Sequence, residues 1–94
     1  MKEKFVDRLI RIMQLAAAVN RTNGPHVNVD FSGHVSTVDV RVYTDAWEPY
    51  AKPAFHKIVN FSGLYDDKDI GTGLDTIIGY LEEIRNDSGR PADA

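Results

Sequence analysis

Residues 26–47 read HVNVDFSGHVSTVDVRVYTDAW, and no other part of the sequence alternates apolar and polar residues so regularly. The apolar positions fall into two sets, Val27, Val29 and Phe31, then Val38, Val40 and Val42. Successive strand side chains point to opposite faces, so a period of two predicts two half-buried strands joined as a β-hairpin. Val35 is out of phase with the later valines. Residues 32–37 must therefore contain a bend, a bulge or the turn, with Gly33 available for a positive φ.

Helical periodicity is found on both sides of this hairpin. The apolar positions before it are Phe5, Leu9, Ile12, Met13 and Ala16, widened by Val6, Ile10 and Ala17, and those near the end of the chain are Leu74, Ile77, Ile78, Leu81 and Ile84. Both spacings are typical of amphipathic helices. Asn20, Asn23, Gly24 and Pro25 should end the first helix. Thr72 followed by Asp75 resembles a capping box and predicts where the second helix begins.

Residues 54–61 predict a third strand, at the edge of the sheet. Lys57 falls on the apolar face of this segment and Pro53 precedes it, and an edge strand tolerates both. The expected fold is a single α+β domain over residues 1–87 with the order helix, strand, strand, strand, helix, followed by a frayed tail at 88–94. The strands should form an antiparallel meander with the second strand central. Both helices should cover one face and leave the other open.

Length and composition favour a soluble domain that acts through its surface. The 94 residues are 43% hydrophobic and 27% charged and include no cysteine, which fits a reducing, cytoplasmic setting. No apolar run approaches the roughly 20 residues of a membrane span, and the N-terminus lacks a signal peptide's apolar core. The net charge of −3 is uneven, because residues 1–59 carry eight Lys and Arg against six Asp and Glu, and residues 60–94 carry three against eight.

The candidate sites for metal or nucleic acid are weak. His26, His34 and His56 could hold zinc only if neighbouring strands brought them together. The acids before the second helix lack the Gly and Glu positions of an EF-hand loop. The element order is also that of double-stranded-RNA-binding domains, but the last helix is preceded by acids where those domains place basic residues. We expect no metal, no cofactor, no catalytic residue and no direct binding of nucleic acid.

Binding hot spots are rich in Trp, Tyr and Arg, and four such residues cluster in and just after the second strand. They are Arg41, Tyr43, Trp47 and Tyr50. Arg41 and Tyr43 should project from the open face, while Trp47 could lie exposed beside it or fold back as a lid on the core. The acidic residues Asp66, Asp67 and Asp69 form a second candidate surface. The sequence predicts a protein partner and no membrane contact.

The hairpin sequence VNVDFSGHVSTVDVRVYTDAW resembles the strand-loop-strand segment of short uncharacterised proteins encoded by phages and prophages of Gram-positive bacteria. This resemblance implies a small accessory protein in the cytoplasm of a bacterial host cell. Such proteins often inhibit a host defence or modify a host machine by binding, as anti-CRISPR proteins do. The alternatives are a homodimeric structural or nucleic-acid-associated protein and a small metal-binding enzyme.

Overall fold

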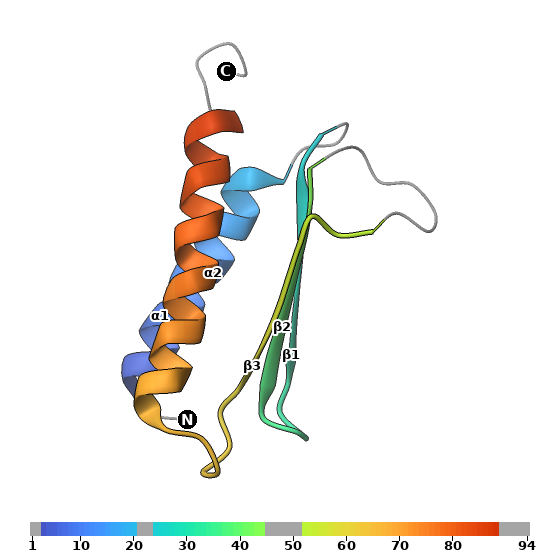
Figure 1. The fold of residues 1–94 in the computed structure, drawn as a ribbon. Coiled ribbons are helices and arrows are strands. Elements are labelled where there is room, and N and C mark those ends of the chain that lie inside the picture. Colours follow the sequence, from blue (N-terminus) through green and yellow to red (C-terminus); the bar gives the residue numbers. More distant parts are fainter. Residues whose placement is uncertain (1–2, 21–23, 45–51, 89–94) are drawn as a thin grey trace.

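The protein folds as an α+β domain in the predicted order of elements (Figure 1). A computed structural model describes residues 3–20, 24–44 and 52–88. The elements are α1 (Glu3–Val19), β1 (His26–Ser32), β2 (Thr37–Tyr43), β3 (Phe55–Asn60) and α2 (Asp67–Ser88). Of the predicted tail at 88–94, Ser88 is the last residue of α2 and the rest lies outside the described residues.

The three strands form an antiparallel meander with β2 in the centre, as predicted. Val40 of β2 lies opposite Val29 of β1 and Lys57 of β3. The helix-facing side chains of the sheet are therefore mostly valines, and Lys57 is half-buried among them at the edge. The predicted edge position of β3 explains why a lysine is tolerated there.

The turn between β1 and β2 lies at residues 33–36, inside the segment where the sequence required it. The prediction of a positive φ at Gly33 is wrong, because Ser36 takes that conformation instead, with φ 53°. The Ser36 N–H donates to the Gly33 carbonyl at 3.4 Å, and the Ser36 carbonyl accepts from the Phe61 N–H at 2.7 Å. The first bond closes the turn and the second ties it to the residue after β3. Together they hold a serine in a region that usually favours glycine.

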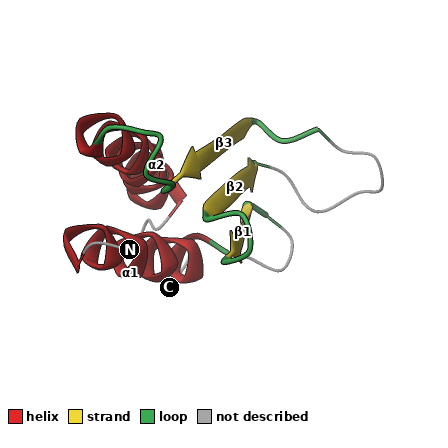
Figure 2. Ribbon diagram, turned by 90° about the horizontal axis from the view of Figure 1, so that it is seen from below, coloured by secondary structure: helices red, strands yellow, loops and turns green. Residues whose placement is uncertain are grey.

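Both helices lie on the same side of the sheet, α1 near β1 and α2 near β3 (Figure 2). The core contains most of the predicted apolar positions of the helices and strands, and also Leu15, Val19 and Ile70, which were not among them. Its fully buried members are Ile12, Leu15, Val19, Val38, Val40, Val42, Leu74, Ile77 and Leu81. Neither of the two described helices lies over the opposite face of the sheet, as expected for a meander with both helices on one side.

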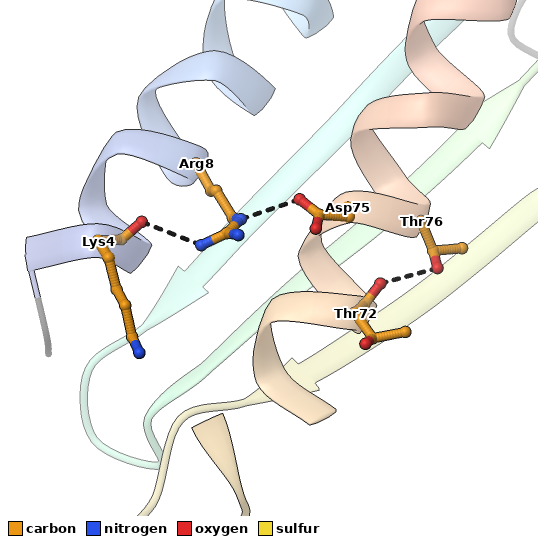
Figure 3. Close-up of polar contacts among 5 residues, drawn as sticks. All are labelled: Lys4, Arg8, Thr72, Asp75 and Thr76. Atoms are coloured by element: carbon orange, nitrogen blue, oxygen red, sulfur yellow. Dashed lines mark hydrogen bonds and ion pairs between the residues drawn. The ribbon is translucent and has the colours of Figure 1, made fainter. Parts of the chain in front are cut away.

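The predicted start of α2 is wrong, because the helix begins at Asp67 and Thr72 lies inside it. The hydroxyl of Thr76 donates to the Thr72 carbonyl at 2.8 Å, within the helix (Figure 3). Gly73, the residue after Thr72, serves packing, since a Cβ there would come within 3.0 Å of the Val59 Cγ2 atom. The glycine thus allows α2 to lie close against β3.

Asn20 joins the end of α1 to the beginning of β1. Its backbone N–H and its side-chain amide both donate to the Ala16 carbonyl, at 3.1 and 2.7 Å. Its side-chain oxygen accepts from the Val27 N–H at 2.8 Å. One side chain therefore satisfies a carbonyl in the last turn of α1 and a strand donor beside the core, which fixes how the helix is placed relative to the sheet.

Replacing Asn20 with Ala should lower the free energy of unfolding by about 1–3 kcal/mol, because two side-chain hydrogen bonds contribute about 0.5–1.5 kcal/mol each. Thermal melting should fall by several degrees, at about 4–8 °C per kcal/mol for a domain of this size. Gln14→Ala is the control, since Gln14 is an exposed residue of α1. Equal melting temperatures for the two variants would contradict this role of Asn20.

Candidate functional site

The candidate site lies on the open face of the sheet, where Arg41 and Tyr43 were predicted to project. The strand register places Arg41 between Asn28 and His56, and Tyr43 opposite His26. Arg41 is exposed and Tyr43 is half-buried. The alternation that buries the valines of β2 therefore presents these polar side chains on the uncovered face.

Asp39 contacts two neighbouring side chains at the centre of this face. Its Oδ1 atom lies 2.9 Å from the His56 Nε2 atom, and its Oδ2 atom lies 3.4 Å from the Arg41 Nη2 atom. Exposed ion pairs contribute little to stability. Their effect here is to restrict the orientation of Arg41 and His56, so that a partner meets side chains with less conformational entropy left to lose.

Tyr43 is held by a ring stack at the end of the same face. Its ring lies over the His26 imidazole with centroids 4.7 Å apart and ring planes 11° apart. The His26 Nε2 atom is buried and has no hydrogen-bond partner. An offset aromatic stack contributes about 0.5–1.5 kcal/mol beyond area burial, so the orientation of the phenol is set before any partner arrives.

Of the other predicted site residues, the acids at the start of α2 do not join Arg41 and Tyr43. Trp47 and Tyr50 lie outside the described residues, so the choice between an exposed Trp47 and a core lid stays open. Asp66, Asp67 and Asp69 lie just before and within the first turn of α2, in the helical layer. Acids are favourable at a helix N-terminus, and Asp67 also pairs with Lys4 at 3.3 Å.

The three histidines are not brought together. His26 begins β1, His34 lies in the turn at the other end of that strand, and His56 lies on β3. Among residues 3–20, 24–44 and 52–88, no group of three His, Asp or Glu side chains is placed to hold a metal ion.

The uneven charge of the sequence is explained by ion pairs between the two helices. Arg8 donates to Asp75 at 2.9 Å, as drawn in Figure 3. Lys4 lies 3.3 Å from Asp67, and Arg11 lies 3.8 Å from Glu82. Residue numbers rise together along both helices, so α1 and α2 run parallel and the basic side of one meets the acidic side of the other.

These contacts lead us to expect no tight binding of random duplex DNA or RNA at physiological salt. Non-specific binding depends on cations that are available to phosphates, and Lys4, Arg8 and Arg11 each lie within 4 Å of a carboxylate. Filter binding over a range of salt concentrations measures this directly. Micromolar affinity that falls steeply as salt rises would contradict the expectation.

Sequence reasoning missed a second surface, formed by α1 and the outer edge of β1. Val6, Ile10 and Met13 were assigned to the widened apolar stripe of the first helix, but the structure leaves them 39–56% exposed. The width of that stripe was the available signal, because a helix that packs on one sheet and one neighbouring helix cannot bury apolar residues on every side.

Comparison of the chain with protein-family models, with curated proteins and with solved structures finds no match in any of the three. In the part of the chain that the structure describes, neither helix is long and apolar enough to cross a membrane. The assignment of function therefore rests on the surface chemistry of the fold.

Proposed function

We propose that the chain is a small, non-enzymatic protein-binding module whose open sheet face contacts a protein partner. The observation that carries this proposal is the fixed placement of Arg41 and Tyr43 on the face that α1 and α2 leave uncovered. Asp39 contacts Arg41, and His26 stacks on Tyr43. Arg and Tyr are among the residues that contribute most to protein interfaces.

The surroundings of these two residues suit a protein surface. Ile58 lies opposite Asp39 on the same face and is 54% exposed, so an apolar side chain adjoins the polar centre. Asp39 and His56 can form further hydrogen bonds with a partner. A mixture of aromatic, apolar and charged groups is typical of protein interfaces, whereas phosphate-binding faces are dominated by cations.

The setting that we propose is the cytoplasm of a bacterial host cell, with the chain acting as a phage accessory protein. Its partner would be a host protein, including the components of a defence system, which the module inhibits or modifies by binding. The support for this setting is the resemblance of the hairpin to proteins of phages and prophages. The acidic net charge of −3 is compatible with a partner that presents a basic surface.

Affinity capture from a Gram-positive bacterial lysate tests the proposal. The wild-type chain and two double variants serve as baits, and bound proteins are quantified by mass spectrometry. We expect Arg41→Ala/Tyr43→Ala to lose a partner that the wild type and Asp66→Asn/Asp69→Asn both retain. If the second variant alone loses the partner, the N-terminus of α2 is the binding surface and the proposal is wrong.

A further inference from the structure

The outer edge of β1 carries backbone groups that no described residue pairs. The Val27 N–H points away from β2, because it donates to the side chain of Asn20 at 2.8 Å. Backbone direction alternates along a strand, so the N–H and C=O groups of Val29 and Phe31 point the same way, as does the Val27 carbonyl. Among the described strands, β1 pairs with β2 alone.

The two edges of the sheet differ in how they are protected. At β3, Pro53 precedes the strand and Lys57 points inward toward the helical layer, and both features discourage the addition of another strand. Pro25 likewise comes directly before β1, so the difference lies in the strands themselves: β1 has no lysine, and its helix-facing residues Val27, Val29 and Phe31 carry no charge. The free edge of β1 can therefore pair with another strand, whereas strand addition at the edge of β3 is disfavoured by Lys57.

An apolar surface adjoins the free edge of β1. Ile10 is 51% exposed and Met13 56%, and Phe31 of β1 is 54% exposed although its ring also lies 6.3 Å from that of Phe61. Met13 and Ala17 line a groove with Val27 and Val29, which shows that this side of α1 lies next to the strand. The other side of α1 carries the ion pairs to α2. An apolar stripe beside an open strand edge is typical of an interaction surface.

We propose that a second copy of this chain occupies this surface, with the two β1 strands antiparallel about a two-fold axis at Val29. Val29 then pairs with Val29 of the second copy. Each Phe31 N–H donates to the Val27 carbonyl across the axis, while the Val27 N–H keeps its bond to Asn20. The side chains of Val27 and Phe31 meet on the helix-facing side, next to the exposed stripes of the two α1 helices. Such an interface is self-complementary, as two-fold symmetry requires.

Hydrogen-bond complementarity between Asp30 and Asn28 favours this occupant and this register. Asp30 lies directly opposite Asp39 within the sheet, and like charges in that position are unfavourable. The two-fold axis at Val29 places Asp30 opposite Asn28 of the second copy, whose amide can donate to the carboxylate. An axis at Asp30 would place the two Asp30 carboxylates opposite each other. The acid thus disfavours an axis at Asp30 and is accommodated by the axis at Val29, which also pairs Val27 with Phe31.

A single introduced cysteine tests the register, because the natural chain has none. At an axis through Val29, the two Val29 Cα atoms would lie about 5.5 Å apart, within the range of a disulfide. Mild oxidation of Val29→Cys should therefore yield mostly covalent dimer. Ile58→Cys is the control on the open face and should stay monomeric on a denaturing gel. Cross-linking of Ile58→Cys, with none for Val29→Cys, would place self-association on the open face and overturn the proposal.

Sedimentation of the unmodified protein tests the assembly itself. We expect a dissociation constant near 10 μM, so the wild type should be mostly dimeric at about 100 μM. Ile10→Glu/Met13→Glu should shift it to monomer with the melting curve of a folded protein, since both residues are exposed. A wild type that stays monomeric throughout would overturn the proposal and indicate that this edge serves a different chain or none. The proposed function of the open face would be untouched by that result.

Discussion

Replacing Val38 with Asp should unfold the protein. Val38 is fully buried, and its cross-strand neighbours on the helix-facing side are Phe31 and Val59. No cation lies opposite to pair with a new carboxylate. An unpaired buried charge costs several kcal/mol, against a total stability of about 5–10 kcal/mol for a domain of this size. Far-UV circular dichroism should show loss of the cooperative melting transition.

Val38→Ile is the control for this prediction, because a change of one methylene in the core should cost no more than about 1–3 kcal/mol. Val40 is a less clean position, since Lys57 lies directly opposite it and could pair with an introduced Asp. A Val38→Asp protein that melts at the wild-type temperature would show that the helix-facing side of the sheet is not the core.

Replacing Arg41 and Tyr43 together with Ala should weaken binding of the protein partner by at least about thirtyfold, equivalent to about 2 kcal/mol. Both side chains lie on the open face and are held by Asp39 and His26. Truncation removes the contact area and the directed hydrogen bonds. Isothermal titration calorimetry with the captured partner measures the change.

Stability should change little in the same double variant. The loss of the stack on His26 costs about 0.5–1.5 kcal/mol, and the exposed Arg41 to Asp39 pair contributes less. Asp66→Asn/Asp69→Asn is the matched control and should bind with wild-type affinity. Unchanged affinity in the Arg41 and Tyr43 variant would show that the open face is only solvated.

The sequence was sufficient for the order of elements, the central place of β2 and the one-sided helical layer. Each followed from a local period, since side chains alternate in strands and recur every three to four residues in helices. The start of α2 and the positive φ of Ser36 were not predictable in this way. Position 73 needs a glycine because the Val59 side chain leaves no room for a Cβ there. Ser36 keeps its conformation because its carbonyl accepts a hydrogen bond from the Phe61 N–H. Both constraints come from residues distant in sequence.

In the candidate site, too, some features follow from local sequence patterns and others depend on residues distant in sequence. The outward direction of Arg41 and Tyr43 followed from alternation, but their contacts with Asp39 and His26 depend on side-chain geometry and on the strand register. The ion pairs between α1 and α2 needed the knowledge that the helices run parallel, and the exposed stripe of α1 needed the position of the sheet beneath it. Local patterns give the direction of a side chain, and tertiary structure gives its neighbours.

An alanine scan along β2 tests most directly whether one face of the sheet maintains the fold and the other binds the partner. Each residue of 38–43 is replaced in turn, and both the free energy of unfolding and the partner affinity are measured. We predict losses of about 2 kcal/mol in stability at the three valines, from lost methyl groups and residual cavities. Affinity should fall instead at Asp39, Arg41 and Tyr43. Losses of stability and affinity at the same positions, without a period of two, would contradict this division of the sheet.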